Sequence, residues 1–267
     1  MPIFEKASIL FAVAALSVAC AAHDATDGSQ GGGGASGDNT ADPDADYLSN
    51  ADERTAGTDP NVPDTDADGY LDGDEVLMGT NPLDPSSRIY QGGWPFQRKK
   101  DSIVDPGFSA TPSIGAVVPR LVAFDQYGQK VDLYDFALHG HPIVIDLSAF
   151  WCGACQDMAG WLEGKPSMLD AKPQFASIRD RVNSGDIYWI TVIFEDGAGV
   201  AAGPPQAVSW AAKFPNDKVT VLADDNRALF DALYPGSYPS LQVLNEDMTF
   251  RYYDRFDYEK ALTTLLP

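Results

Sequence analysis

Residues 142–155 read PIVIDLSAFWCGAC, an apolar run followed by a Cys-x-x-Cys pair. The run predicts a buried strand at 142–149 that leads into a helix beginning at the cysteines. Cys152 and Cys155 then lie one helical turn apart, close enough to form and reopen a small disulfide ring. The start of the helix offers unpaired N–H groups and the positive end of a dipole, and both favour a thiolate on Cys152. The pattern therefore predicts a redox-active dithiol.

Strand-like and helix-like segments alternate on both sides of this motif. A hairpin is expected at 121–124 and 130–133, and a central strand buried on both faces at 186–194. Shorter strands are expected at 219–222, 241–244 and 249–253, and helices at 173–183, 204–214, 226–234 and 257–266. This order predicts an α/β domain with a central mixed β-sheet flanked by helices.

Residues 108–267 resemble the thioredoxin superfamily, in the redoxin branch that includes periplasmic thiol-disulfide oxidoreductases. The resemblance rests on the Cys152–Cys155 motif, on Asp146 six residues before it, and on Pro239 before a strand. It implies the thioredoxin fold, a buried acid at Asp146 beneath the dithiol, and a cis Pro239 that faces the disulfide. Burial in an apolar strand should raise the pKa of Asp146.

The expected chemistry gives each of these residues a role. Cys152 attacks a substrate disulfide as the thiolate, and Cys155 resolves the mixed disulfide. Asp146 takes the proton of Cys155 during resolution and returns it later. The Tyr238 backbone pairs with an extended substrate peptide, and Trp151 shields the disulfide and contacts the partner. No organic cofactor is needed for this exchange.

Three alternatives are open at this level. A peroxiredoxin-type thiol peroxidase would carry Thr three residues before its cysteine, where this chain has Ala149. A zinc site usually needs four ligands, and His139 and His141 lie at the far end of the strand from the two cysteines. A non-catalytic, calcium-dependent surface or binding protein would have no reason to combine the dithiol with Asp146 and Pro239.

An acidic stretch at 64–75, DTDADGYLDGDE, fits the twelve-position calcium loop. Such loops place oxygen ligands at positions 1, 3, 5, 7, 9 and 12 and a glycine at position 6. The expected ligands are Asp64, Asp66, Asp68, the backbone carbonyl of Tyr70, Asp72 and Glu75. Hard oxygen ligands at this spacing predict Ca²⁺.

The same pattern occurs earlier in the chain, at 42–53. Its expected ligands are Asp42, Asp44, Asp46, Asn50 and Glu53, with Tyr47 in place of the turn glycine. Both copies end in Gly-Thr-(Asp/Asn)-Pro and resemble thrombospondin type 3 repeats, which implies a short calcium-stiffened stalk at 41–85. The alternative is a disordered acidic linker. Residues 86–107 are expected to be a connector.

The N-terminus and the charge indicate where the protein works. The apolar run 9–19 is typical of a secretory signal, and Val-Ala-Cys at 18–20 resembles a bacterial lipoprotein box. This implies a signal peptide at 1–20, lipid on Cys20 and a flexible linker at 21–40, with ordinary cleavage nearby as the alternative. The net charge of −21 argues against nucleic-acid binding.

We therefore expect a bacterial exported protein that a lipid anchors to the membrane, facing the periplasm or the cell surface. Its partners would be the thiols and disulfides of other exported proteins and an unidentified redox partner.

Overall fold

A computed structural model describes residues 39–267 of the chain. The expected signal peptide at 1–20, the lipidation of Cys20 and nearly all of the linker at 21–40 lie outside the described residues. Among the residues that are described, no helix has the length and apolar character needed to cross a membrane.

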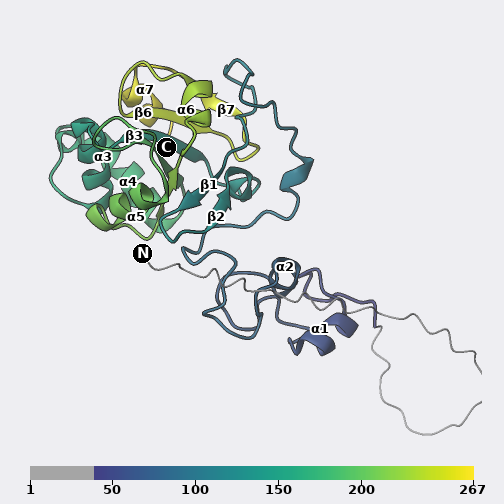
Figure 1. Ribbon diagram of the computed structural model, residues 1–267. Coiled ribbons are helices and arrows are strands. Elements are labelled where there is room, and N and C mark those ends of the chain that lie inside the picture. Colours follow the sequence, from purple (N-terminus) through teal and green to yellow (C-terminus); the bar gives the residue numbers. More distant parts are fainter. Residues whose placement is uncertain (1–38) are drawn as a thin grey trace, which may run out of the picture. The chain divides into compact units, whose positions relative to one another are not determined.

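Seven strands form one mixed sheet in the order β2-β1-β5-β4-β3-β6-β7. Figure 1 shows this sheet together with the helices around it. The strands are β1 (Val122–Asp125), β2 (Lys130–Asp132), β3 (Ile143–Ala149), β4 (Tyr188–Glu195), β5 (Val219–Ala223), β6 (Ser240–Leu244) and β7 (Phe250–Tyr252). The central β3, β4 and β5 are parallel, whereas β1, β2, β6 and β7 pair antiparallel with their neighbours. All seven residues of β3 are buried, as its apolar sequence predicts.

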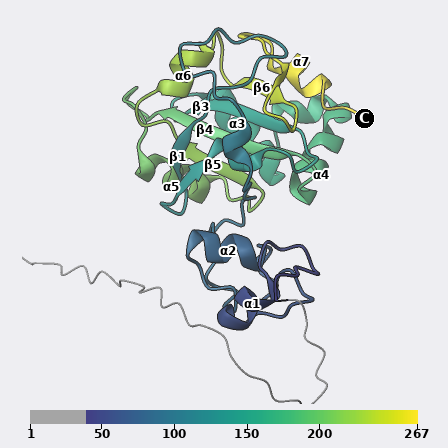
Figure 2. The same ribbon diagram turned by 90° about the vertical axis from the view of Figure 1, so that its right-hand side faces the viewer.

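Helices lie on both sides of this sheet (Figure 2). The helices that follow β3 are α3 (Gly153–Glu163), α4 (Ala176–Ser184), α5 (Pro204–Lys213), α6 (Ala228–Leu233) and α7 (Tyr258–Thr263). The described residues also contain four 3₁₀ turns: η1 (Lys100–Ser102), η2 (Leu133–Phe136), η3 (Met168–Ala171) and η4 (Pro173–Phe175). The parallel β3-α3-β4 unit, followed by the β6-β7 hairpin and α7, gives the thioredoxin fold that was expected.

The local predictions agree with the structure to within a few residues at the element ends. The hairpin expected before the motif is the β1–β2 pair, and α3 begins directly after Cys152. Gly164 ends α3 in a left-handed conformation, with φ of 92°. This conformation costs glycine little because it has no Cβ, so Gly164 can end the helix there.

The two acidic repeats have matching backbones. Each contains a short helix, α1 (Asn50–Ala56) and α2 (Asp72–Met78), which the calcium-loop pattern alone does not specify. Tyr47 adopts a φ of 79° at the position where Gly69 has 103° in the second copy, so the first loop makes the same turn without glycine. A Cβ on Gly73 would lie 2.2 Å from the Asp46 carbonyl oxygen, so the repeats approach each other closely at this point.

Residues 86–107 are more than a connector. Ile89, Tyr90 and Trp94 are buried and belong to the same hydrophobic core as the sheet. The apolar side chains in this otherwise polar stretch explain the difference, because burial of large aromatic surface stabilises a docked segment.

Candidate functional site

The two cysteines form a disulfide at the start of α3. Cys152 is the N-cap of this helix, and its Sγ accepts the backbone N–H of Cys155 at 3.1 Å. Cys152 is 6% exposed and Cys155 is fully buried. The N–H that reaches Cys152 is one of the free donors of a helix start, and in the reduced state such a donor stabilises a thiolate. The two cysteines therefore have different surroundings. Cys152 is slightly exposed and contacts a helix-start N–H, as an attacking thiol requires, whereas Cys155 is shielded from solvent.

Asp146 is fully buried in the middle of β3. Its carboxylate accepts hydrogen bonds from the Ser148 hydroxyl at 2.8 Å, the Thr191 hydroxyl at 3.3 Å and the Trp189 indole at 3.4 Å. Burial raises the pKa of Asp146 to about 6, although these three donors oppose the rise. The carboxyl can therefore take up and release a proton close to neutral pH.

The sheet face that carries Asp146 is the face under α3. Thr191, which donates to Asp146, lines a small cavity together with Ala159 and Leu162 of α3. The helix that begins at the dithiol thus covers the buried acid. Because Asp146 is completely buried, it is not a solvent-facing residue.

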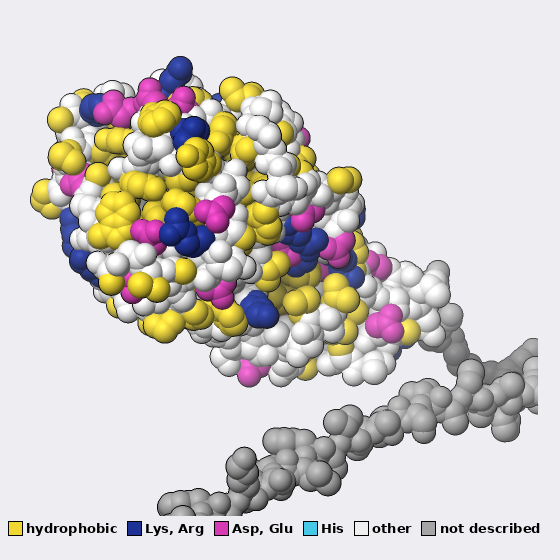
Figure 3. Space-filling model, turned by 45° about the horizontal axis from the view of Figure 1, so that its top comes forward, with side chains coloured by type: hydrophobic (Ala, Val, Ile, Leu, Met, Phe, Trp, Pro, Cys, Tyr) yellow, Lys and Arg dark blue, Asp and Glu magenta, His cyan; other side chains and the backbone are white. Residues whose placement is uncertain are grey.

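Aromatic side chains lie beside the dithiol loop. The Trp151 ring meets the Tyr238 ring edge-on, with centroids 5.3 Å apart, and its indole N–H donates to Glu195 at 2.8 Å. Trp151 is 47% exposed, so its ring is open to a partner as well as to the protein. On the face drawn in Figure 3, hydrophobic side chains are exposed between acidic and basic ones. The Tyr238–Pro239 peptide bond is cis.

Several of these neighbours were not identified from the sequence. Trp189 and Thr191 stand on β4, and Glu195 ends that strand, so each reaches the site through strand pairing. The register places Thr191 opposite Asp146. The sequence did hold a clue to these neighbours. Trp189 and Thr191 carry hydrogen-bond donors inside an otherwise apolar strand, and buried donors need a partner.

The raised pKa of Asp146 has a consequence for stability. Asp146→Asn is expected to stabilise the fold at pH 8 by up to about 3 kcal/mol, which corresponds to a pKa raised from 3.8 to about 6. The substitution stabilises the fold because the carboxyl group of Asp146 holds its proton more tightly in the folded state. Ionising it above pH 6 therefore destabilises the folded protein, and asparagine does not ionise. The difference should be near zero at pH 4, grow between pH 4 and 6, and stay constant above. Urea unfolding of both proteins across this range measures it, and a gain that is equal at pH 4 and pH 8 would contradict the assignment.

The two acidic loops gather carboxylates in the same way. One oxygen from each of Asp42, Asp44 and Asp46 lies within 4.8 Å of the others, and so does one from each of Asp64, Asp66 and Asp68. This spacing suits one ion with Ca–O distances of about 2.4 Å, since two ligands on opposite sides would then be about 5 Å apart. In both copies the backbone amides of positions 5 and 6 donate to the first aspartate.

Further carboxylate oxygens in these loops are buried and without a partner. Glu53 is fully buried, and neither of its carboxylate oxygens accepts a hydrogen bond. Other buried carboxylate oxygens that accept no hydrogen bond are both oxygens of Asp44 and one oxygen each of Asp46, Asp66 and Glu75. Buried charges without partners are costly, and a divalent cation would offset that cost. The donor set thus fits a hard cation. In the second loop Asp72 also receives two hydrogen bonds from Thr65.

Comparison with known proteins matches these two parts separately. Residues 44–63 and 64–85 each match the family model of the bacterial TSP3 repeat. A search of curated proteins found no match to the chain. The chain therefore combines a thioredoxin-fold domain that holds a Cys-Gly-Ala-Cys disulfide with two repeats of the bacterial TSP3 type.

Solved structures of thioredoxin-like proteins resemble part of this chain. The thioredoxin domain of a thiol-disulfide oxidoreductase from Bacteroides vulgatus is 13% identical, covering 59% of this chain and 100% of that one, with a TM-score of 0.40. A thioredoxin-like protein from Bacteroides caccae is 12% identical over 59% of this chain and 50% of that one, with a TM-score of 0.44. A thiol:disulfide interchange protein from Bacteroides sp. is 14% identical over 58% and 90%, with a TM-score of 0.39. The fold assignment rests on the strand order and connections described above.

Proposed function

We propose that residues 108–267 are a thiol-disulfide oxidoreductase that uses Cys152 and Cys155. The observation that carries this proposal is the disulfide at the N-terminus of α3, in which Cys152 accepts a helix-start N–H and Cys155 is buried behind it. A helix-start N–H of this kind stabilises a thiolate once the disulfide is reduced, and burial shields the resolving thiol.

The proposed reaction moves two electrons and two protons. In the reducing direction, the Cys152 thiolate attacks one sulfur of a substrate disulfide, forming a mixed disulfide and releasing the other substrate sulfur as a thiolate, which takes a proton. The Cys155 thiolate then attacks Cys152, which closes the Cys152–Cys155 disulfide and releases the second substrate thiol. The oxidising direction is the same sequence in reverse.

The neighbouring residues support these two steps. Asp146, with a pKa near 6, would accept the proton of Cys155 as it becomes a nucleophile. The Tyr238 backbone, next to the cis Pro239, would pair with an extended segment of the substrate. The half-exposed Trp151 ring would contact the partner.

A single-turnover assay tests the proposal. The full chain is reduced, freed of reductant and mixed anaerobically with an excess of insulin as a disulfide substrate. One insulin disulfide should be reduced per chain as the Cys152–Cys155 disulfide forms, counted by thiol alkylation and mass spectrometry. The same experiment is repeated with glutathione disulfide as the substrate. If the reduced chain keeps both thiols and leaves both substrates intact, the result contradicts the proposed thiol-disulfide exchange.

We further propose that the protein is exported and held at a membrane by lipid on Cys20. Its partners would then be thiols and disulfides of other exported proteins, together with a redox partner that resets the dithiol. Metabolic labelling with a fatty-acid analogue, comparing the chain with Cys20→Ser, tests the anchor. Equal labelling of both proteins would contradict it.

We also propose that both repeats bind Ca²⁺. The support is the family match, the two aspartate triplets and the buried, unpaired oxygens of Glu53 and Glu75. The ligands would be those expected from the sequence, with Asn50 and Asp72 at the ninth position of each loop. Calcium would neutralise the crowded carboxylates and let residues 41–85 act as a stiff stalk.

Calcium binding should weaken as the pH falls from 8 to 6. Burial raises the pKa of Glu53 and of Glu75 to about 7, so protons compete with the cation in this range. An ion that needs the carboxylate form should lose roughly tenfold in affinity at each site over these two pH units. Calorimetric titration at both pH values, in buffers with different ionisation enthalpies, measures the affinity and the protons released. An affinity that does not change with pH would contradict a role for these two carboxylates.

A further inference from the structure

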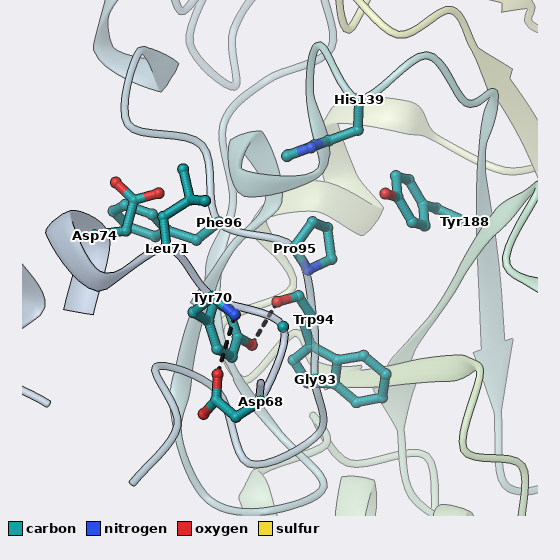
Figure 4. Close-up of a pocket in the computed structure, with 11 residues that line it drawn as sticks. Asp68, Tyr70, Leu71, Asp74, Gly93, Trp94, Pro95, Phe96, His139 and Tyr188 are labelled. Atoms are coloured by element: carbon teal, nitrogen blue, oxygen red, sulfur yellow. Dashed lines mark hydrogen bonds between the residues drawn. The ribbon is translucent and has the colours of Figure 1, made fainter. Parts of the chain in front are cut away.

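One side chain of the second repeat reaches into the buried interior of the neighbouring segment. The Tyr70 hydroxyl donates to the backbone carbonyl of Trp94 at 2.6 Å, and Tyr70 is only 6% exposed (Figure 4). The Tyr70 backbone N–H donates to Asp68 of its own loop at 3.0 Å, the second contact drawn there. Tyr70 stands at position 7, where a calcium loop uses the backbone carbonyl as ligand. The backbone of this residue therefore belongs to the loop, and its side chain contacts residues outside it.

Trp94 continues the contact into the sheet. Its indole N–H donates to Asp125 at 2.8 Å, and Asp125 is the last residue of β1. The other oxygen of this fully buried carboxylate accepts the backbone N–H groups of Tyr127 and Gln129, both at 2.9 Å. These two amides form the turn between β1 and β2. A chain of hydrogen bonds thus joins the second loop to the β1–β2 hairpin.

A second set of contacts lies on the same segment. Arg98 donates to Asp74 of α2 at 2.7 Å. Two residues later, Lys100 pairs with the fully buried Asp135 at 2.7 Å, and the Tyr90 hydroxyl donates to the same carboxylate at 2.6 Å. Arg98 therefore pairs with the repeat, and Lys100 pairs with the domain. Residues 89–100 are held from both sides.

We propose that the second repeat is a structural part of the thioredoxin-like domain, and that residues 89–100 and the β1–β2 hairpin tighten when residues 64–75 bind calcium. The inference rests on the calcium binding proposed above. Closing the loop on a cation fixes the backbone of Tyr70, and its phenol then holds the Trp94 carbonyl in place. Without the ion, repulsion among Asp64, Asp66 and Asp68 opens the loop and loosens that contact.

Hydrogen exchange on the full chain tests this coupling, with 1 mM Ca²⁺ or with chelator. In the unaltered protein, calcium should slow exchange at 64–75, at 89–100 and in the β1–β2 hairpin. In Tyr70→Phe, calcium should still slow exchange at 64–75, because the ligand at this position is a backbone carbonyl. The calcium effect at 89–100 and in the hairpin should fall by about fivefold or more, because the variant loses the hydroxyl's bonds to the Trp94 and Tyr90 carbonyls and from the Tyr90 N–H.

Two further variants separate the possible outcomes. Tyr47→Phe, a change of the same kind on a half-exposed tyrosine of the first repeat, should leave the calcium effect on the hairpin unchanged. Trp94→Phe should keep the effect at 64–75 and lose it in the hairpin, because the indole donor to Asp125 is gone. One outcome in the unaltered protein is that calcium slows exchange at 64–75 but not at 89–100 or in the hairpin. That result would contradict the coupling and leave the proposed calcium site standing. Calcium that binds nowhere, seen directly by calorimetry, would overturn the proposed calcium sites and the coupling with them.

Discussion

Replacing Cys152 by serine is expected to lower the rate of insulin disulfide reduction by roughly 10³-fold or more, in line with the loss of a covalent nucleophile. A serine hydroxyl stays protonated at neutral pH and cannot form a mixed disulfide. The helix-start N–H that now contacts Cys152 would have no thiolate to stabilise. Initial rates at fixed reductant and substrate concentrations measure the effect.

Cys155→Ser is the matched comparison. It keeps the attacking thiol but removes the resolving one, so the first turnover should stop at a mixed disulfide between Cys152 and the substrate. This adduct can be isolated without reductant and identified by mass spectrometry. A Cys152→Ser protein with unchanged rate, or a Cys155→Ser protein that forms its adduct through another residue, would contradict the assigned order of attack.

Removing calcium is expected to unfold much of residues 41–85 at pH 8. Glu53 would then be buried and ionised, with both of its oxygens, both oxygens of Asp44 and one of Asp46 unpaired, which is a costly state. Few buried apolar side chains oppose the loss, since Leu48 and Tyr70 are the large ones inside the two loops. With free calcium at about 100 times Kd, linkage is worth about 2.7 kcal/mol, so amides of α1 and α2 should exchange about a hundredfold faster in chelator.

Glu53→Gln and Glu75→Gln assign the effect to the individual loops. Each removes one charge from one site and keeps the size of the side chain, so each should weaken calcium protection mainly in its own repeat. Exchange at α1 and α2 that is the same in calcium and in chelator would show that the repeats fold without the ion. The pH dependence predicted for calcium binding would then lose its basis as well.

Local features of this chain were predictable because neighbouring residues determine them. Cys152 was expected to begin a helix, and it is the N-cap of α3. Short stretches of sequence also predict the hairpins, the buried central strands and the repeated acidic loops. The signals are the spacing of apolar residues, the turn residues between strands and the spacing of the aspartates. The raised pKa of Asp146 followed from a carboxyl group in an apolar strand.

Features that depend on distant partners were not predictable in the same way. Thr191 and Trp189 meet Asp146 only because β3 and β4 are parallel in a particular register. Trp94 donates a hydrogen bond to Asp125, which lies far away along the chain. Because no local pattern indicates this contact, the sequence predicted only a connector at 86–107. Local patterns carry no information about which buried donor meets which buried acceptor, although each such group requires a partner.

The most direct test of the central claim is the redox equilibrium of Cys152 and Cys155 in the full chain. Thiols are trapped after equilibration across a graded series of glutathione and dithiothreitol buffers, and the oxidised fraction is read by mass spectrometry. An oxidoreductase should give one reversible two-electron transition, between about −270 mV for a reductant and about −120 mV for an oxidant. A pair that never forms a reversible disulfide in any buffer would contradict the account and favour a non-catalytic binding role for the domain.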